Sequence, residues 1–340
     1  MQRCLQLAGL GSGQVAPNPM VGSVLVYNNR IIGEGYHQRF GEAHAEVNCI
    51  SSVAPEDSHL ISKSTLYVSL EPCDHQGKTP PCTDLILQHQ ISKVVIGCKD
   101  ISSKVNGRGI EHLRKEGVEV IESVLEKECL YINRRFFHFE KNRQPYIILK
   151  WAETADGFIA GEGGQTKISN LYSDRIVHQW RAEESAIMVG YRTALLDDPQ
   201  LNVRLAQGTD PVRIVFDKHL SLPSTLKFFD QSQATLVFNF CEDKKRGNVE
   251  YIRIAESGSI QQILAHLYDK KLLSLLVEGG CGLLQSFIDG GYWNEARIIQ
   301  SDAFIYSGVR GPHLKNAHYS HQEKVSNDTH YFHLNPAFQL

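Results

Sequence analysis

Short apolar runs rich in β-branched residues alternate with amphipathic segments in the first 143 residues of the chain. The runs predict strands and the amphipathic segments predict helices. The predicted strands are 23–27, 30–36, 65–70, 93–97 and 118–121, and the predicted helices are 3–10, 44–52, 81–88, 109–116 and 124–141. An Asn28-Asn29 turn pairs the first two strands as a hairpin. The later alternation of strands and helices predicts a mostly parallel sheet that helices cover on both faces.

The pattern breaks at Gln144-Pro145 and then resumes. A helix is predicted at 174–184, and the predicted strands are 146–151, 185–190, 212–217, 235–239, 274–278 and 297–300. A chain of 340 residues exceeds the length of about 100–200 residues typical of one domain. We therefore expect two α/β domains, 1–143 and 144–340.

Residues 44–82 contain a group of residue types that bind metal. His44-Ala-Glu46 opens a predicted helix, and Cys73 and Cys82 each follow a proline. One His and two Cys can fill three corners of a zinc tetrahedron and leave the fourth for water, as catalytic sites do. Zinc base deaminases show the pattern H-x-E…P-C-x-x-C, in which the Glu moves protons and does not bind the metal. We predict His44, Cys73 and Cys82 as zinc ligands and Glu46 as the catalytic acid–base.

Two features leave other interpretations open. The cysteines are separated as P-C-x8-C, a longer loop than the common pattern. A structural zinc knuckle would need a fourth protein ligand, for which His75 and Cys49 are candidates, and the cysteines could also be reduced residues of a core. Asn18, between Pro17 and Pro19, is either a turn residue or a donor and acceptor for a base edge.

Composition narrows the class of protein. The net charge of −3 argues against a large nucleic-acid surface, which usually forms a basic domain or stripe. Eight cysteines in 340 residues do not have the density of a disulfide framework. The N-terminal segment is too short and polar for a signal peptide, and no apolar run is long enough for a membrane span. We expect a cytoplasmic protein without membrane or nucleic-acid partners.

Taken together, the motifs resemble the family of bifunctional riboflavin-biosynthesis deaminase–reductases. In the first part the resemblance rests on Pro17-Asn-Pro-Met-Val-Gly22, His44-Ala-Glu46, Thr65-Leu-Tyr-Val-Ser-Leu-Glu-Pro-Cys73 and Asp74-His-Gln-Gly-Lys-Thr-Pro-Pro-Cys82, whose long inter-cysteine loop is itself a family feature. In the second part it rests on Leu149-Lys150, Asp156-Gly157, Arg181-Ala182, Gly190-Tyr-Arg-Thr193, Asp197-Asp198-Pro199, Leu201, Arg204 and Val277-Glu278-Gly-Gly280.

The resemblance implies two folds and two reactions. A cytidine-deaminase-like α/β/α domain would use Zn²⁺ to deaminate a small molecule, 2,5-diamino-6-(5-phosphoribosylamino)pyrimidin-4-one. A dihydrofolate-reductase-like α/β domain would use NADPH to reduce the ribosyl group of the product to a ribityl chain. We also expect a homo-oligomer.

The resemblance also implies roles for individual residues. On the deaminase substrate side it places Asn18, His75 and Lys78. On the reductase substrate side it places Lys150, Thr166, Leu201, Arg204 and Glu278, with Arg204 as the phosphate partner. On the NADPH side it places Thr193, Asp197, Gly280, Cys281, Gly282, Leu283, Leu284, Gln285 and Ser286. Lys150 and Asp197 are equal candidates to handle the proton when the ribose ring opens.

The second half departs from the family pattern at the cofactor side. Thr166 stands where the family has a Ser, the family's Trp is either deleted or replaced by Lys167, and Glu153 stands where the family has a small residue. One alternative is therefore an active deaminase with a second half that serves as a scaffold without reductase activity. Another alternative is a nucleic-acid base deaminase, but this class has the short P-C-x-x-C and a basic rim, neither of which occurs here.

Overall fold

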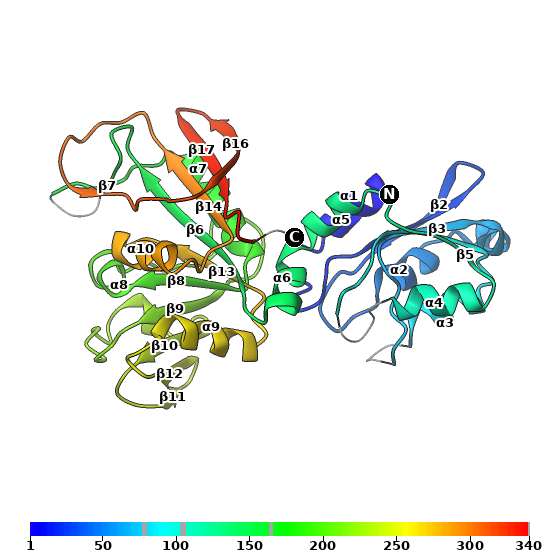
Figure 1. Cartoon of the computed structure of the whole chain (residues 1–340), viewed down its shortest axis with the longest axis horizontal. Helices are drawn as coiled ribbons and strands as arrows, with labels where there is room; N and C mark the ends of the chain where they lie inside the picture. The colour runs from blue at the N-terminus through cyan, green and yellow to red at the C-terminus, as the bar shows by residue number, and fades with distance from the viewer. Residues whose placement is uncertain (77–79, 103–106, 163–165, 339–340) are drawn as a thin grey trace. The chain divides into compact units, whose positions relative to one another are not determined.

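The computed structural model of the chain describes residues 1–76, 80–102, 107–162 and 166–338 (Figure 1). The described residues form two compact units, 1–143 and 144–338, each with its own sheet. Among them, no helix combines the length and the apolar character needed to cross a membrane. We describe each unit separately.

The first unit contains a five-stranded sheet in the order β2-β1-β3-β4-β5. Its strands are β1 (Gly22–Tyr27), β2 (Arg30–Tyr36), β3 (Thr65–Leu70), β4 (Lys93–Cys98) and β5 (Glu119–Ile121). The hairpin predicted from the Asn28-Asn29 turn is present, and both residues have positive φ angles. Strand β1 runs antiparallel to its neighbours β2 and β3, whereas β4 runs parallel to its neighbours β3 and β5. Because β2 and β3 are both antiparallel to β1, four of the five strands run in the same direction, and the expectation of a mostly parallel sheet holds except at β1.

Helices cover both faces of this sheet, as Figure 1 shows. They are α1 (Gln2–Gly9), α2 (Ala45–Ser51), η1 (Pro55–Lys63), α3 (Cys82–Gln88), α4 (Arg108–Lys115), α5 (Glu126–Ile132) and α6 (Arg134–Asn142). Apolar side chains of α2, α3 and α4 pack with Leu25, Leu66 and Ile96 on one face. On the other face Cys4 and Leu7 of α1 pack with Val24. The predicted three-layer α/β/α arrangement is confirmed.

The single long helix predicted at 124–141 is wrong, because the structure has two helices there. Asn133 separates α5 from α6, and its side chain is buried. Its Oδ1 accepts the backbone N–H of Met20 at 2.8 Å, and its Nδ2 donates to the Met20 carbonyl at 2.8 Å. These two hydrogen bonds anchor Asn133 to the segment before β1, where a continuous helix would not place it. Helix α5 also begins at Glu126 and not at residue 124 as predicted, since Ser123 and Leu125 adopt positive φ angles.

The second unit is built on a ten-stranded sheet in the order β11-β12-β10-β9-β8-β13-β6-β14-β17-β16. The strands from β12 to β14 in this order are mutually parallel, and β11, β17 and β16 pair antiparallel at the two sides. The strands are β6 (Tyr146–Glu153), β8 (Ala186–Gly190), β9 (Val212–Phe216), β10 (Thr235–Asn239), β11 (Lys244–Arg246), β12 (Val249–Arg253), β13 (Ser274–Glu278), β14 (Glu295–Gln300), β16 (His318–Val325) and β17 (Asp328–Leu334). A short pair, β7 (Phe158–Ala160) and β15 (Val309–Arg310), lies outside this sheet.

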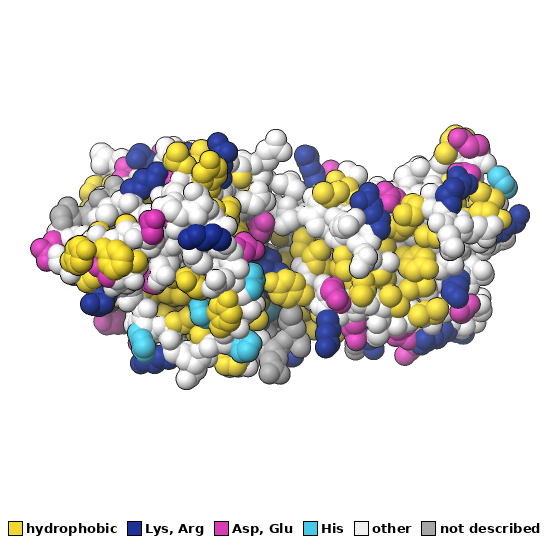
Figure 2. All heavy atoms as spheres, turned by 90° about the horizontal axis from the view of Figure 1, so that it is seen from above, with side chains coloured by type: hydrophobic (Ala, Val, Ile, Leu, Met, Phe, Trp, Pro, Cys, Tyr) yellow, Lys and Arg dark blue, Asp and Glu magenta, His cyan; other side chains and the backbone are white. Residues whose placement is uncertain are grey.

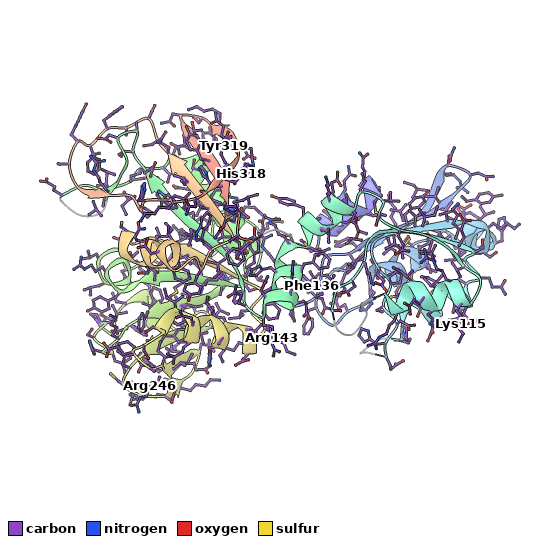
Figure 3. The ribbon with its side chains drawn as sticks, viewed as in Figure 1. Lys115, Phe136, Arg143, Arg246, His318 and Tyr319 are labelled. Carbon is purple, nitrogen blue, oxygen red and sulfur yellow. The ribbon has the colours of Figure 1, made fainter. Side chains whose placement is uncertain are left out.

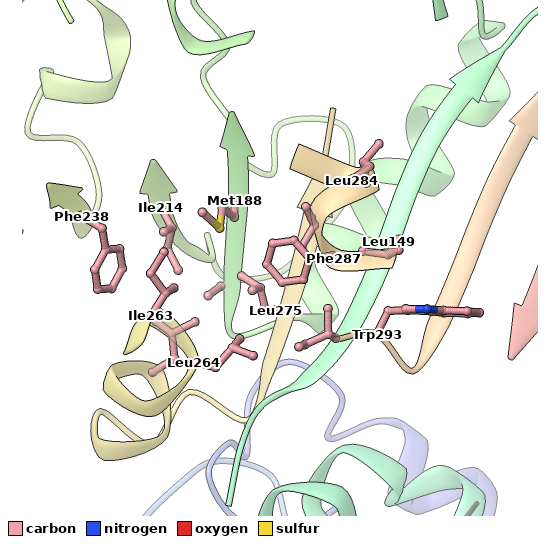
Figure 4. Packing of buried hydrophobic residues seen from close by; sticks show 14 of the residues in the cluster. Leu149, Met188, Ile214, Phe238, Ile263, Leu264, Leu275, Leu284, Phe287 and Trp293 are labelled. Carbon is pink, nitrogen blue, oxygen red and sulfur yellow. The ribbon is translucent and has the colours of Figure 1, made fainter. Parts of the chain in front are cut away.

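Helices also cover both faces of the large sheet. They are α7 (Leu171–Glu183), α8 (Tyr191–Asp197), η2 (Lys227–Phe229), α9 (Ser259–Asp269) and α10 (Cys281–Asp289). Figure 4 shows Ile263 and Leu264 of α9 and Phe287 of α10 packed on one face of the sheet, against Leu149 and Leu275. On the other face α8 packs with alternate residues of the same strands, and α7 packs on β14 and β17. This is the α/β architecture expected for the second domain.

The sequence pattern misses several elements of this unit. The helix predicted from Asp174 begins at Leu171, because Asn170 caps it by accepting the N–H groups of Tyr172 and Ser173, both at 2.9 Å. Helix α9 and the hairpin of β16 and β17 were not predicted. Almost every residue of β16 is exposed, so the strand lacks the alternation of apolar and polar residues that marks a half-buried strand.

Candidate active sites

The three predicted metal ligands meet at one point of the first unit. His44 is the N-cap of α2, Cys82 is the first residue of α3, and Cys73 lies in the loop after β3. The Nδ1 of His44 lies 3.3 Å from the Sγ of Cys82 and 3.5 Å from the Sγ of Cys73. Tetrahedral zinc, with Zn–N of about 2.0–2.1 Å and Zn–S of about 2.3 Å, places such N and S atoms about 3.5 Å apart. The donor set therefore fits a zinc ion.

One of the two sulfurs is prepared to bind a cation. A hydrogen bond from the Cys82 thiol lowers the pKa of Cys73 to about 4, and the backbone N–H of Cys82 also donates to the Cys73 sulfur at 3.4 Å. Thiolates, not thiols, bind metals. Helix α2 begins after His44 and helix α3 begins at Cys82, so the N-terminal ends of both helices, which carry partial positive charge, lie at the three candidate ligands.

Glu46 lies in the first turn of α2 and is 3% exposed. Burial raises the pKa of its carboxyl group, and the nearby Cys73 raises it further. Its side chain is within hydrogen-bonding distance of Cys82. A buried carboxylate with a raised pKa, beside three metal-binding atoms, can accept a proton from water and return it to a substrate.

Asn18 is held next to the zinc ligands by a histidine that the sequence did not single out. The Nδ1 of His37 donates to the carbonyl of Ala43 at 3.0 Å, so its Nε2 accepts the amide N–H of Asn18 at 3.1 Å. Burial lowers the pKa of His37, which agrees with a neutral ring in these roles. The ring also contacts His44 edge to face, with centroids 5.6 Å apart. This geometry leaves the Oδ1 of Asn18 as an acceptor beside the metal site.

The loop that carries Cys73 is held by the buried side chain of Glu71. Its carboxylate accepts the backbone N–H groups of Asp100, Gly107, Gly109 and Ile110, at distances of 3.0–3.4 Å. Burial raises the pKa of Glu71, and these donors oppose the rise. The carboxylate thus ties the end of β3 to the start of α4, two residues before a zinc ligand.

Asp74, on the other side of Cys73, fixes the next part of the loop. It accepts the hydroxyl of Thr83 at 2.8 Å and pairs with His112 of α4 at 2.5 Å. The backbone N–H of Thr83 also donates to the carbonyl of Cys73 at 3.2 Å. The loop positions of both cysteines are therefore coupled by polar contacts.

Gly109→Ala is expected to disturb the zinc loop. A Cβ at this position would lie 2.1 Å from the backbone oxygen of Pro72, directly before Cys73. Overpacking of this kind costs roughly 1–3 kcal/mol. We expect a lower free energy of unfolding by denaturant and weaker zinc retention under chelator competition. The control is Gly9→Ala, where a Cβ meets no atom within 4 Å. Equal stability and equal zinc retention of the two variants would contradict the packing described here.

The structure does not favour a closed structural zinc site. Among the described residues, only His44, Cys73 and Cys82 form a cluster of possible metal ligands. Cys49 is fully buried in the apolar core, where burial raises its pKa to about 12. His75 is not part of the cluster, and its buried Nδ1 has no hydrogen-bond partner among the described residues. Lys78 lies outside the described residues.

In the second unit, three charged side chains form a buried cluster. Lys150 on β6 and Glu278 on β13 are register partners on adjacent parallel strands. Arg181 of α7 donates to both oxygens of Glu278, with both distances 2.8 Å, and the Nζ of Lys150 lies 3.9 Å from one of them. Burial alone would raise the pKa of Glu278, but the charges of Arg181 and Lys150 outweigh it and lower that pKa to about 2. Burial lowers the pKa of Lys150.

Two adjoining cavities meet at this cluster. The small cavity, of about 530 Å³, is lined by Lys150, Thr166, Lys167, Asp174, Val177, His178, Arg181 and Arg204. The large cavity, of about 1210 Å³, extends over the carboxyl ends of β8, β9 and β13, where open parallel sheets bind ligands. Lys150, Thr166, Lys167 and Arg181 line both cavities. A group transferred between two bound molecules would pass there.

The cations around the small cavity suit a phosphorylated ligand. Lys150, Lys167, Arg181 and Arg204 all line it, and arginine forks match the geometry of phosphate oxygens. The expected substrate-side residues Leu201 and Glu278 line the large cavity instead. No role was predicted for Arg181, although it lies three residues after His178 and therefore on the same face of helix α7.

Most of the residues expected on the cofactor side line the large cavity: Thr193, Asp197, Gly280, Cys281, Gly282, Leu283 and Ser286. Gly279 and Gly280 have φ angles of +83° and +73°, which glycine adopts without strain, and Gly280 is the N-cap of α10. Leu284 and Gln285, the other two residues expected there, do not line the large cavity, because the helix turns them away from it. Leu284 is fully buried in the core, and Gln285 bonds to Asp289 and the backbone of His313.

Glu153 and Lys167, which depart from the family pattern, each contact other side chains of the second unit. Glu153 accepts the indole N–H of Trp151 at 2.8 Å and lies 3.4 Å from the amide of Gln300, so its carboxylate is engaged within the sheet. Lys167 lines both cavities and pairs with Asp174 at 3.2 Å. Neither charge is therefore an unpaired group facing the large cavity.

Comparison with known proteins covers both units. A model described as "Cytidine and deoxycytidylate deaminase zinc-binding region" matches residues 1–98, and one described as "RibD C-terminal domain" matches residues 145–305. The riboflavin biosynthesis protein RibD of Actinobacillus pleuropneumoniae is 39% identical over 86% of this chain and 80% of its own length. The chain belongs to the RibD family. RibD of Aquifex aeolicus is 37% identical over 91% of this chain and 88% of its own length.

Solved RibD structures have the same fold. A structure from Thermotoga maritima, described as a diaminohydroxyphosphoribosylaminopyrimidine deaminase and 5-amino-6-(5-phosphoribosylamino)uracil reductase, has a TM-score of 0.91 and 35% identity over 98% of this chain and 97% of that one. RibD of Acinetobacter baumannii has a TM-score of 0.88 and 27% identity over the same shares of the two chains.

This member of the RibD family is thus a bifunctional enzyme of riboflavin biosynthesis, a zinc-dependent deaminase and an NADPH-dependent reductase. This confirms the family resemblance, the reaction types and the cofactors expected from the sequence. It acts on a small-molecule substrate. On the face of the protein that Figure 2 shows, Lys and Arg side chains are dispersed among acidic and apolar ones.

Proposed function

We propose that residues 1–143 deaminate 2,5-diamino-6-(5-phosphoribosylamino)pyrimidin-4-one and that residues 144–340 then reduce the ribosyl group of the product to a ribityl chain. The observation that carries the first half is the convergence of His44, Cys73 and Cys82 beside the buried Glu46. The second half is supported by two cavities that share Lys150 and Arg181. The Thermotoga maritima relative is described by the same two reactions.

In the deaminase half, we assign His44, Cys73 and Cys82 as the residues that hold zinc. Zinc, when bound, lowers the pKa of a water molecule enough to make it a nucleophile at neutral pH. Glu46 takes one proton from this water and delivers it to a ring nitrogen. It then takes the second proton, from the hydroxyl on the attacked carbon, and delivers it to the amine, which leaves as ammonia when the C–N bond breaks. The Oδ1 of Asn18 accepts an N–H of the pyrimidine. The Nδ1 of His75, which has no hydrogen-bond partner among the described residues, contacts the substrate. We also propose Lys78 as a substrate contact, as the family resemblance implies.

In the reductase half, the phosphate of the substrate binds in the small cavity against Arg204 and Arg181, beside Thr166. NADPH, when bound, supplies the hydride. Thr193, Asp197 and the glycine turn before α10 hold the cofactor in the large cavity. The sequence left Lys150 and Asp197 equal as proton donors, and the structure favours Lys150. Lys150 lines both cavities, whereas Asp197 lines the large one.

The proton chemistry at Lys150 follows from its surroundings. When the ribose ring opens, the bond between C1 and the ring oxygen breaks and that oxygen needs a proton. Burial lowers the pKa of Lys150, which makes its ammonium a better acid near neutral pH. Glu278 stays ionised beside it and holds both Lys150 and Arg181 in place.

We further propose a cytoplasmic homo-oligomer. None of the eight cysteines forms a disulfide bond, which suits a reducing compartment. Strands β11 and β16 lie at the two edges of the large sheet, where Figure 3 labels Arg246, His318 and Tyr319. The exposed edge of β16 can pair with another strand. A molar mass in solution equal to one chain would contradict the oligomer.

A two-step assay tests the proposal and separates it from the scaffold alternative. With the diaminopyrimidine substrate and NADPH, we expect one ammonia released per substrate, followed by loss of NADPH absorbance. When the deaminated intermediate replaces the diaminopyrimidine in the same mixture, NADPH should be consumed without ammonia release. Ammonia release with no NADPH consumption on either compound would show that the second half is a scaffold.

A further inference from the structure

His178 is a buried histidine in the second unit to which the proposed chemistry gives no role. It lies on α7, one turn before Arg181, and is 3% exposed. Its ring lines the small cavity beside Arg204. The backbone N–H of Arg204 donates to the Nδ1 of His178 at 3.2 Å. A helix side chain thus contacts the backbone of Arg204, which itself lines the cavity.

The segment that carries Arg204 depends on such side-chain contacts. Residues 198–204 form neither helix nor strand. Leu201 has a φ angle of +53°, a conformation that non-glycine residues adopt only when their surroundings impose it. The N–H of Val203 donates to Asp210 at 2.7 Å, and Arg181 donates to the carbonyl of Asn202 at 3.4 Å. With His178, side chains therefore hold three consecutive residues of the segment.

The ring of His178 is suited to accept this hydrogen bond. Burial lowers its pKa to about 4, and the charges of Arg181 and Arg204 contribute to the shift. At neutral pH the ring is uncharged, so Nδ1 can keep a lone pair for the Arg204 N–H. Deleting the ring would leave that backbone donor without its acceptor and would leave space beside the segment.

We propose that His178 is a positioning residue of the reductase, which holds the backbone of Arg204 so that its guanidinium meets the substrate phosphate. This inference rests on the proposed binding of the phosphate at Arg204. His178 acts through Arg204 and does not take part in proton or hydride transfer. Its removal should therefore change the KM for the phosphorylated intermediate and leave the KM for NADPH and the kcat nearly unchanged.

Two substitutions at this position separate positioning from general packing. In His178→Asn, the Oδ1 stands close to the place of the ring Nδ1 and can accept the same N–H. In His178→Leu, the volume is similar but the acceptor is lost. We expect His178→Leu to raise the KM for the intermediate about tenfold, the size of one hydrogen bond lost from a partly buried donor. His178→Asn should stay close to the unaltered enzyme.

A double-mutant cycle with Arg204→Ala gives the decisive readout. If His178 acts through Arg204, His178→Leu should add no further rise in KM once Arg204 is an alanine. NADPH binding, followed by the fluorescence of the bound nicotinamide, should be the same in all variants and shows that the unit is folded. This readout does not depend on turnover.

Three results would overturn the inference. The first is a rise in KM from His178→Leu that adds in full to that from Arg204→Ala. The second is an equal loss in His178→Asn and His178→Leu. The third is an unchanged KM in His178→Leu although Arg204→Ala raises it. If Arg204→Ala itself leaves the KM unchanged, the proposed phosphate contact at Arg204 fails as well.

Discussion

Replacing Glu46 by glutamine is expected to lower the rate of deamination by about 10²–10⁴-fold. Glutamine keeps the size of the side chain but cannot accept the proton of the attacking water or return it to the substrate. Glu46 is buried and is not one of the clustered ligand residues, so the variant should fold and keep its zinc. Ammonia release from the diaminopyrimidine substrate measures the loss, and elemental analysis measures the metal.

A nearby carboxylate provides the matched control. Glu42 is exposed and lies just before the same helix, so Glu42→Gln removes the same charge without touching the metal site. It should deaminate at the normal rate. In Glu46→Gln, reduction of the deaminated intermediate should also continue at its normal rate. Undiminished ammonia release in Glu46→Gln would remove Glu46 from the mechanism.

Replacing Lys150 by methionine is expected to lower the kcat of the reductase by about 10²–10⁴-fold. Methionine fills a similar volume but cannot donate a proton to the ring oxygen of the ribose. Lys150 lines both cavities, and its side chain is only 14% exposed. The bidentate contact between Arg181 and Glu278 remains in the variant, so the buried carboxylate keeps a partner. NADPH oxidation with the deaminated intermediate measures the effect.

The surface lysine Lys244 of β11 provides the control for this prediction. Lys244→Met changes the same side chain at the edge of the sheet, away from both cavities. It should reduce the intermediate normally, and both variants should bind NADPH with similar affinity. A Lys150→Met enzyme with normal kcat would show that another group donates the proton, and Asp197 would then be the first to test.

The zinc site could be predicted because its signals are local. His44 and Glu46 are two residues apart, and each cysteine follows a proline, so the spacing alone points to a deaminase. The contacts that hold the long loop between Cys73 and Cys82 leave no such signal in the sequence. Glu71 and Asp74 hold it through contacts with α4, far along the chain, and these partners became visible only in the structure.

The reductase site was harder to predict because its residues come from separate strands and helices. Lys150 and Glu278 meet only because β6 and β13 are neighbours in the sheet, an order that the sequence pattern does not specify. Leu284 and Gln285 were assigned to the cofactor as part of a continuous run, but a helix presents only some of its residues to one cavity. His178 has no motif of its own.

Some errors in the fold share a cause with these omissions. Residues 124–141 have the composition of one helix, yet two hydrogen bonds between Asn133 and Met20 break it. Such tertiary contacts override local propensity and leave no periodic signal. The edge strand β16 was missed for the opposite reason, since an exposed strand needs no apolar face.

X-ray absorption at the zinc edge, together with the zinc content of the purified protein, tests the central claim most directly. We predict one zinc per chain, bound by one nitrogen at about 2.0–2.1 Å, two sulfurs at about 2.3 Å and one light atom from solvent. Cys82→Ser should lose most of this zinc. A chain without zinc, or zinc held by four protein ligands, would contradict the assignment of the first unit as a deaminase.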